Sequence, residues 1–448
     1  MGKKLFGTDG IRGTAGKPPL DPRTVTALGI ALAEDLKSRG EARHPVLIGM
    51  DTRESGPSIA AHLAEGLRRG GADAAFAGVL TTPGVAYLTR TGDYSAGVMI
   101  SASHNPFGDN GIKVFARTGF KLPDAEEHQV EEAIFRLLDG IEEEPKAEAL
   151  RQNREPKTYL DFLLSTLTSA RPLAGMKVAM DCGNGAASAL APELFRAAGA
   201  EVTPIACEPD GRNINLKCGA LHPENVRAKV LETGADAGVS FDGDADRAML
   251  VAPSGRIVDG DAVMLIEAKR LQAAGHLPGN TVVATVMSNL GLQKGLEELG
   301  ISMVRTPVGD KYVLEEMVRR EAALGGEQSG HVIFREFSTT GDGMLTALQV
   351  LETAAKARQS LDELAAGMVV YPQMLVNVRV KERRPLEELS RVSAAIKDCE
   401  ARLDGSGRVL VRYSGTEPLL RVMVEAMELG VVEELVNCVT AAIHADLG

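Results

Sequence analysis

A serine and a histidine stand side by side in the stretch from Ser101 to Pro106, which runs Ser-Ala-Ser-His-Asn-Pro. A small, apolar run at residues 96–100 precedes it and is short enough to be a fully buried strand. The proline marks a turn, because the residue before a proline avoids the helical region. A hydroxyl beside an imidazole on a tight loop at a strand end suits nucleophilic or phosphoryl-transfer chemistry. An ordinary turn is the alternative, since Ser and Asn side chains bond the local backbone.

Three carboxylates stand on alternate residues directly after the apolar run 237–241: Asp242, Asp244 and Asp246. This alternation in a loop can bring three hard oxygens to one Mg²⁺ or Ca²⁺ ion. An EF-hand also begins this way, but Arg247 occupies the position of its glycine and Pro253 that of its glutamate. The pattern therefore predicts a metal site whose shell leaves room for a phosphate oxygen, with a solvated acidic turn as the alternative.

Two further loops carry groups for binding an oxygen-rich ligand. Residues 327–331, Glu-Gln-Ser-Gly-His, combine acceptors, donors and a titratable ring, which suits the hydroxyl or amino groups of a sugar. Residues 412–418, with Arg421 shortly after, combine hydroxyls, a glycine and two guanidiniums, which suits a phosphate. A polar helix cap and an exposed turn are the respective alternatives.

The glycine-rich stretch from Phe6 to Gly13 lets backbone amides approach a ligand closely. Within it, Arg12 can present a planar fork to a phosphate. A turn-rich N-terminal segment without a ligand explains the same residues equally well.

Composition excludes several classes of protein. The chain has 448 residues, and a typical domain length near ~150 residues suggests about three or four domains. It is 44% hydrophobic and 25% charged, and no window is apolar enough to span a bilayer, so we expect no membrane partner. A net charge of -12 disfavours nucleic-acid binding. Five cysteines without Cys-x-x-Cys spacing predict a reducing cytoplasm rather than a zinc site or disulfides.

A pattern of buried strands alternating with helices recurs three times, which predicts α/β domains with mainly parallel sheets. The first copy has strands near 45–50, 71–80 and 96–100, the second near 177–181, from about 199 onward and near 237–241, and the third near 281–285, 300–306 and 322–324. In parallel sheets ligands bind beyond the carboxyl ends of the strands, where each copy carries a polar loop. The remaining residues, from about Val369, predict a smaller α+β domain.

Together these motifs resemble the α-D-phosphohexomutase family. The resemblance rests on residues 6–13, 101–106, 242–247, 327–331 and 412–418, which follow the family's order and extend over nearly the whole chain. It implies four domains around a central cleft, each contributing one loop. We place these domains at residues 1–153, 154–253, 254–368 and 369–448.

The resemblance also implies roles for individual residues. Ser103, rather than Ser101, would be the phosphorylated serine, and a phosphoserine oxygen would join the three aspartates, Asp242, Asp244 and Asp246, around Mg²⁺. Lys113 would act in proton transfer and Arg247 near the transferring phosphoryl group. We add the neighbouring His104 and the phosphate-facing Arg12 to this catalytic set.

Other residues match the ligand-binding positions of the family. Glu327 and Ser329 correspond to its sugar-contacting pair, and His331 lies in the same loop. The site for the phosphate that does not react matches five residues: Arg412, Ser414, Gly415, Thr416 and Arg421.

Gln328 and residues 213–219 resemble the branch that acts on glucosamine phosphates, whereas Ala220-Leu221 and Tyr413 depart from common patterns. The implied function is Mg²⁺-dependent interconversion of glucosamine 6-phosphate and glucosamine 1-phosphate through a phosphoserine and a sugar 1,6-bisphosphate, which also acts as activator. This reaction supplies cell-wall amino sugars, and the family suggests a homodimer. The alternatives are a mutase for glucose or mannose phosphates, or a phosphosugar-binding protein without catalysis.

Overall fold

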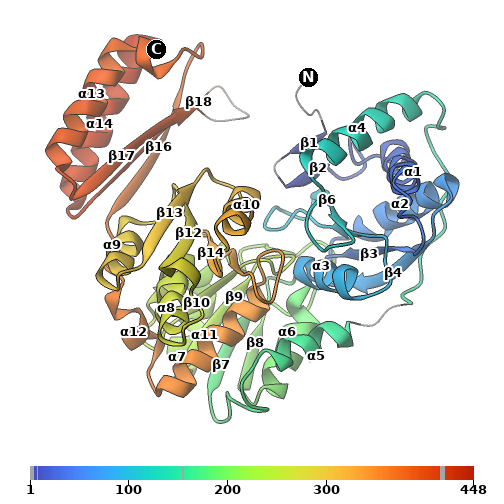
Figure 1. Cartoon of the computed structure of the whole chain (residues 1–448), viewed down its shortest axis with the longest axis horizontal. Helices are drawn as coiled ribbons and strands as arrows, with labels where there is room; N and C mark the ends of the chain where they lie inside the picture. Colours follow the sequence, from blue (N-terminus) through green and yellow to red (C-terminus); the bar gives the residue numbers. More distant parts are fainter. Residues whose placement is uncertain (1–4, 8, 154–155, 414–418) are drawn as a thin grey trace. The chain divides into compact units, whose positions relative to one another are not determined.

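The computed structural model describes residues 5–7, 9–153, 156–413 and 419–448. The chain forms two compact units, and each is assembled from two separate stretches. The first contains Met1–Met287 and Met303–Ala366, and the second contains Ser288–Ser302 and Gly367–Gly448. Within the described residues the strands form four sheets, three in the first unit and one in the second (Figure 1).

The first sheet has the strand order β1-β2-β6-β5-β3-β4. Its strands are β1 (Phe6–Gly7), β2 (Gly10–Thr14), β3 (Val46–Met50), β4 (Ala74–Val79), β5 (Ala96–Ile100) and β6 (Asp109–Ala116). β3, β4 and β5 are parallel, whereas β1, β2 and β6 are antiparallel to their neighbours. Parallel strands end at the same edge of a sheet, so the residues after β3, β4 and β5 meet there.

Helices cover both faces of this sheet. The four helices are α1 (Pro22–Ser38), α2 (Gly56–Gly70), α3 (Thr82–Thr91) and α4 (Asp124–Leu138). Val98 of β5 packs into the apolar core shared with α1, α2 and α4. The next residue towards the N-terminus, Gly97, faces α3, where a Cβ would lie 2.0 Å from the Thr89 hydroxyl. Since alternate residues of a strand face opposite sides, α3 covers the other face.

The second sheet has the order β11-β10-β9-β7-β8. Its strands are β7 (Lys177–Asp181), β8 (Glu201–Ile205), β9 (Ala237–Phe241), β10 (Ala248–Val251) and β11 (Ile257–Val258), accompanied by α5 (Lys157–Ser165), α6 (Ala187–Ala197) and α7 (Pro223–Thr233). β7, β8 and β9 are parallel, and β10 turns back beside β9. The loop between β9 and β10 therefore lies at the carboxyl edge of the parallel strands.

The third sheet has the order β13-β12-β14-β15. It consists of β12 (Thr281–Thr285), β13 (Ser302–Thr306), β14 (Leu324–Gly326) and β15 (Val332–Phe334), with α8 (Gly260–Ala273), α10 (Asp310–Arg320), α11 (Gly343–Ala357) and the short α12 (Leu361–Leu364). β14 runs parallel to β12, and β15 returns antiparallel beside β14. The residues between β14 and β15 thus repeat the position of the loop after β5 in the first sheet.

The second unit contains an antiparallel sheet with the order β16-β18-β17. Its strands are β16 (Gln373–Arg379), β17 (Gly407–Tyr413) and β18 (Leu419–Ala426), and its main helices are α13 (Ser390–Leu403) and α14 (Leu429–Leu447). The two helices pack on the sheet around one apolar core (Figure 1).

The helix α9 (Leu290–Glu298) also belongs to the second unit, although it lies between β12 and β13 in the sequence. The backbone N–H of Leu290 donates to Glu425 Oε1 at 2.8 Å, and Arg408 donates to the carbonyl oxygen of Ser288 at 2.6 Å. Arg408 also pairs with Glu425 at 2.5 Å. These bonds tie the start of α9 to β17 and β18.

The expected class is confirmed: three α/β sheets that mix parallel and antiparallel strands are followed by a smaller α+β unit. The strands predicted in the three copies are present. Across the described residues, every helix is too short or too polar to cross a membrane.

Candidate active site

Ser103 lies in the serine loop, which we define as residues 101–108 between β5 and β6. Its Oγ donates to Asp242 Oδ2 at 2.6 Å and lies 3.3 Å from His104 Nδ1. Only 1% of the residue is exposed, and its φ of 52° is in the left-handed region. The structure thus brings the predicted serine, its neighbouring imidazole and the first predicted aspartate together, although Ser103 and Asp242 are 139 residues apart.

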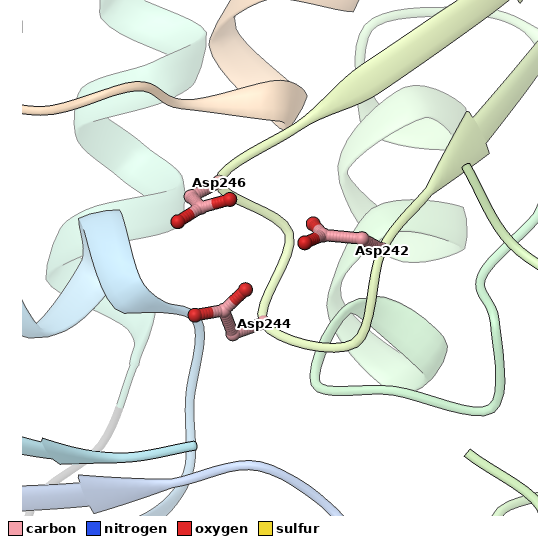
Figure 2. A group of neighbouring side chains, drawn as sticks. All are labelled: Asp242, Asp244 and Asp246. Carbon is pink, nitrogen blue, oxygen red and sulfur yellow. The ribbon is translucent and has the colours of Figure 1, made fainter. Parts of the chain in front are cut away.

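The predicted metal ligands occupy the aspartate loop, residues 242–247 between β9 and β10. Figure 2 shows their three carboxylates turned towards a common centre. One oxygen from each lies within 4.8 Å of the others, and all three residues are buried. Among the described residues, Asp244 Oδ1 and Asp246 Oδ1 have no hydrogen-bond partner. Buried carboxylate oxygens without donors fit a hard divalent cation.

Lys113 of β6 provides a positive charge beside this loop. Its Nζ lies 3.0 Å from Asp244 Oδ2, 3.1 Å from Asp246 Oδ2 and 3.2 Å from Asp9 Oδ2. Burial opposes the charge, but the carboxylates outweigh it and raise the pKa of Lys113 well above its usual value. The side chain therefore remains protonated at neutral pH.

The aspartates experience different electrostatic environments. Burial and the nearby carboxylates of Asp246 and Asp244 raise the pKa of Asp242 well above its usual value. Burial opposes ionisation of Asp244 too, but the charge of Lys113 and the hydrogen bond from Thr82 lower its pKa to about 2. The loop thus combines one carboxyl group that resists ionisation with one that is stably ionised.

A cavity of about 380 Å³ opens beside the aspartate loop. The predicted residues that line it are Arg12, His104, Asp246, Arg247, Glu327 and His331. Burial and the positive charges of Arg247 and Arg12 lower the pKa of His104 to about 4. Its imidazole is therefore neutral at neutral pH, while the two arginines supply positive charge for an anionic ligand.

The arginines are held in different ways. Arg12 donates to Asp9 at 2.6 Å, and its side chain is 30% exposed. Arg247 Nε lies 3.8 Å from Asp246 Oδ1. Although burial opposes its charge, the carboxylates of Asp246 and Asp242 raise the pKa of Arg247. Both guanidiniums thus face the cavity while carboxylates fix one side of each.

The sugar loop, residues 327–331 between β14 and β15, brings its predicted residues to the same cavity, except Ser329. Glu327 Oε1 accepts from the backbone N–H of Gly309 at 3.1 Å, and His331 Nε2 accepts from that of Gly341 at 3.2 Å. Ser329 is exposed and lines an adjoining cavity of about 640 Å³. Glu327, His104 and Arg247 line both cavities, which links the two spaces.

The predicted phosphate-binding arginines lie in the second unit. Arg412 of β17 and Arg421 of β18 are directly opposite each other in the antiparallel pair. Burial and the charge of Arg421 lower the pKa of Arg412. Arg421 Nε has no hydrogen-bond partner within the described residues. Ser414, Gly415 and Thr416 lie outside the described residues.

Sequence reasoning missed four polar residues beside these groups: Asp9, Thr82, Lys121 and Asp310. Asp9 and Asp310 line the 380 Å³ cavity, and Lys121 pairs with both of them. Thr82 Oγ1 donates to Asp244 Oδ2 at 2.5 Å. The position of Thr82 shortly after β4, which ends at Val79, was a usable signal, because the loops of parallel strands converge there.

Comparison with known families accounts for almost the full chain. Four models described as phosphoglucomutase/phosphomannomutase match it: domain I at residues 3–139, domain II at 157–255, domain III at 259–371 and the C-terminal domain at 375–441. Among solved structures, a phosphoglucomutase/phosphomannomutase family protein from Burkholderia thailandensis has a TM-score of 0.80 at 24% identity, covering 99% of this chain and 97% of that one. An Aspergillus fumigatus N-acetylphosphoglucosamine mutase, in complex with GlcNAc-6P and magnesium, has a TM-score of 0.66 at 19% identity, covering 99% and 96%.

Curated relatives are similar from end to end. A phosphoglucosamine mutase from Solibacter usitatus (strain Ellin6076) is 58% identical over 451 residues and covers all of both chains. Another from Koribacter versatilis (strain Ellin345) is 48% identical and covers 100% of this chain and 98% of its own. With all four family models and these full-length relatives in agreement, the chain belongs to the phosphoglucomutase/phosphomannomutase family, the phosphohexomutases that its motifs resemble.

Proposed function

We propose that this protein is a phosphoglucosamine mutase, an isomerase that interconverts glucosamine 6-phosphate and glucosamine 1-phosphate. Full-length relatives with this name are up to 58% identical to it. The observation that carries the proposal is the contact of Ser103 Oγ with Asp242 Oδ2, at 2.6 Å, beside a cavity lined by Arg12 and Arg247. This arrangement provides an oxygen that can carry a phosphoryl group, a metal site and positive charge for the transferring phosphate.

The aspartate loop fits a Mg²⁺ ion, since three buried carboxylates converge and two of their oxygens lack donors among the residues that the structure describes. Asp242, Asp244 and Asp246 would hold it together with an oxygen of phosphorylated Ser103. When bound, the ion supplies charge stabilisation to the phosphoryl group. The remaining steps depend on side chains of the chain itself.

In the proposed reaction, a free hydroxyl of the sugar phosphate attacks the phosphorus of phospho-Ser103. A new P–O bond to the sugar forms, the bond from phosphorus to Ser103 Oγ breaks, and the hydroxyl proton passes to Oγ. The product is a sugar 1,6-bisphosphate, which reorients and returns its other phosphoryl group to Ser103. The second transfer restores phospho-Ser103, so the complete cycle consumes no bisphosphate. Catalytic amounts of it therefore suffice as activator.

His104 and Lys113 have complementary parts in this proposal. The neutral imidazole of His104, 3.3 Å from Ser103 Oγ, is placed to relay a proton to or from that oxygen. Lys113 keeps its proton at neutral pH, so it begins the reaction as a proton donor and as a stabiliser of negative charge. Arg247 and Arg12 balance the charge of the phosphate in the cavity.

The sugar would be oriented by Glu327, Ser329 and His331, whose acceptors and donors can serve hydroxyls in both orientations of the bisphosphate. Arg412 and Arg421, with Ser414, Gly415 and Thr416, would bind the phosphate that is not reacting. Two guanidiniums directly opposite each other support this role, because an anion between them offsets their mutual repulsion.

We also propose where the protein acts and how it is organised. The five cysteines, all free thiols, are compatible with a reducing cytoplasm. We propose a homodimer and four domains, at residues 1–153, 154–253, 254–368 and 369–448.

The test is phosphorus NMR of the purified protein with glucosamine 6-phosphate, Mg²⁺ and a trace of sugar 1,6-bisphosphate. We expect formation of glucosamine 1-phosphate, and slower conversion of glucose and mannose 6-phosphates run in parallel. Faster conversion of glucose or mannose phosphate would assign another substrate to the same chemistry. No conversion by protein that carries phosphoserine would contradict the proposed catalysis.

Replacing Ser103 by alanine is the sharpest variant for this assay. Ser103→Ala should abolish turnover and remove the phosphate from the intact mass while the protein remains folded. The matched control is Ser95→Ala, because Ser95 is equally buried and its hydroxyl bonds the carbonyl oxygen of Glu41 at 2.6 Å, outside both cavities. Turnover retained by Ser103→Ala would overturn the assignment.

A further inference from the structure

Ser103 adopts a backbone conformation that residues with a Cβ rarely adopt. Its φ of 52° lies in the left-handed region, which is unfavourable for most residues other than glycine, asparagine and aspartate. The conformation directs Oγ to Asp242. Such a conformation persists only where surrounding contacts impose it, and the contacts around Ser103 come from two different sheets.

Arg53, shortly after the end of β3 at Met50, holds the carbonyl side of the serine loop. It is 1% exposed. Its Nη2 donates to the carbonyl oxygens of Ser103 at 3.0 Å and Asn105 at 2.8 Å. Its Nη1 donates to those of Pro106 and, at 2.9 Å, Asp109. One guanidinium thus binds four carbonyl groups between Ser103 and the start of β6.

The amide side of Ser103 is fixed through the partner of the same arginine. Arg53 Nε donates to Asp51 Oδ2 at 2.8 Å, and the same carboxylate oxygen accepts from Ser101 Oγ at 2.6 Å. Ser101 Oγ in turn accepts from the backbone N–H of Ser103 at 2.9 Å. The buried Asp51–Arg53 pair therefore controls both polar backbone groups of Ser103.

Asn215 adds a second clamp from the loop between β8 and α7. Its Nδ2 donates to the carbonyl oxygens of Ser103 at 2.9 Å and Asn105 at 3.2 Å, the same two that Arg53 Nη2 binds. Gly243 of the aspartate loop lies against this point, since a Cβ there would be 2.5 Å from the Ser103 carbonyl oxygen and 2.9 Å from Asn215 Nδ2. The clamp therefore sets the position of Ser103 relative to the aspartate loop.

We propose that Arg53 and Asn215 are positioning residues that hold Ser103 in its left-handed conformation. In this conformation the Ser103 hydroxyl faces Asp242, and the phosphate of phospho-Ser103 reaches the carboxylates of the aspartate loop. Neither residue lines either cavity, so both act through Ser103 rather than on the sugar. The inference rests on the proposed mutase function. It predicts that their loss slows phosphoryl transfer without weakening substrate binding.

The test uses Arg53→Lys and Asn215→Ala in the full-length phosphorylated protein. Lysine keeps the charge beside Asp51 but cannot serve four carbonyl groups in a planar fork. Two controls remove similar bonds elsewhere. Arg335→Lys breaks bonds to the carbonyl oxygens of Ala322, at 2.8 Å, and Glu321, at 2.7 Å, whereas Asn225→Ala breaks one to that of Lys217, at 2.6 Å.

We expect each test variant to lower kcat for glucosamine 6-phosphate by about tenfold or more while KM stays within about twofold, because displacing a reacting atom by about 1 Å costs up to a hundredfold. The double variant should lose less than the product of the two, since both clamps act on one loop. Rates are expressed per mole of phosphoserine, which removes any effect of misfolded protein. The controls should retain the parent kcat.

A second readout does not depend on turnover. The phosphorus resonance of phospho-Ser103 should shift or broaden in both test variants and in neither control. If Arg53→Lys fails to fold, the half-buried Asn215 still provides the test. An unchanged kcat and unchanged resonance in Asn215→Ala would overturn the inference. If the parent protein carries phosphoserine but converts no sugar phosphate, the proposed function fails, while the resonance still decides the positioning role.

Discussion

At the scale of single residues, Thr82 holds the proposed metal ligand Asp244 in place. Its hydroxyl donates to Asp244 Oδ2 at 2.5 Å, and its backbone N–H donates to the carbonyl oxygen of the same aspartate at 3.0 Å. Thr82 is the first residue of α3, beside the first sheet, whereas Asp244 follows the second sheet. A hydrogen bond of this kind fixes the orientation of a ligand and tunes its basicity.

We predict that Thr82→Val weakens metal binding about tenfold, because contacts behind a ligand commonly contribute about 10- to 100-fold to metal affinity. The measurement is Mn²⁺ binding followed by electron paramagnetic resonance, with Mg²⁺ as competitor. Thr89→Val is the control, since Thr89 is also buried in α3 and bonds the Val85 carbonyl oxygen at 2.7 Å. Equal affinities of the two variants would contradict the assigned role of Thr82.

The residues predicted from sequence and those missed differ in what identifies them: a local sequence pattern, or a contact with a residue far away in the sequence. Ser103 and the aspartates follow recognisable buried strands, so local pattern and strand order were enough to indicate them. Thr82 acquires its partner across 162 residues, and Lys121 pairs with Asp9 and Asp310, which belong to different elements. Such pairings arise only when sheets pack together, and no spacing in the sequence records them.

At the scale of elements, a buried junction joins α5, α11 and α3. Tyr159 of α5 donates its hydroxyl to Asp342 Oδ2 at 2.8 Å, and Asp342 Oδ1 caps α11 by accepting from the N–H of Leu345 at 3.0 Å. Nearby, the rings of Tyr87 and Phe162 stack with centroids 4.1 Å apart. Burial raises the pKa of Asp342 from 3.8 to about 6. The junction supports the second and third sheets, which carry the aspartate and sugar loops.

We predict that this carboxyl group makes stability depend on pH. The folded-state pKa of Asp342 lies above the unfolded-state pKa, so the folded protein binds the proton more tightly. The stabilisation that proton binding gives is therefore lost as pH rises from about 4 to about 6. A separation of about two pH units corresponds to roughly 3 kcal/mol. Asp342→Asn keeps a capping oxygen and removes the ionisation, so the variant should gain stability relative to the parent as pH rises.

Unfolding temperatures of parent and variant, measured from pH 4 to pH 7.5, give the comparison. Asp161→Asn, on the same helix as Tyr159 but with a side chain 57% exposed, should show no such trend. A difference between parent and Asp342→Asn that is constant with pH would argue against a buried carboxyl group that resists ionisation.

Element prediction succeeded for parallel strands and was weaker for the antiparallel ones. β5 and β9 consist of short apolar runs and were recognised. β6 begins with Asp109, Asn110 and Gly111, which are typical of a turn, and it carries Lys113 in a buried position, so its sequence does not resemble a strand. The lysine is tolerated because carboxylates from other loops pair with it, which local sequence cannot indicate.

At the scale of the whole molecule, we assign the arginine pair of the second unit a part in the proposed reaction. Arg412 and Arg421 face each other on β17 and β18, so their charges repel until an anion binds. We predict that Arg421→Gln raises KM for glucosamine 6-phosphate about tenfold or more, in line with the loss of a charge-assisted bond to phosphate. Thermal stability should be equal or higher, because the repulsion is relieved.

Steady-state kinetics and thermal unfolding of the same preparation provide this test. Arg402→Gln is the control, since Arg402 belongs to the second unit but pairs with Glu434 at 2.8 Å on the exposed side of α13. A rise in KM of the same size in both variants would indicate a general effect of charge, and no rise in Arg421→Gln would remove the arginine pair from substrate binding.

The division of the second unit into residues 288–302 and 367–448 bears on how the protein is made. During synthesis, α9 leaves the ribosome long before Glu425, which binds its first amide. Its apolar residues Leu290, Leu292 and Leu296 are buried in the finished protein and have no complete unit to join until translation ends. While the third sheet is being synthesised, the apolar side chains of α9 thus have no partner to pack against. A chain that stops prematurely near residue 367 never acquires the strands and helices on which α9 packs.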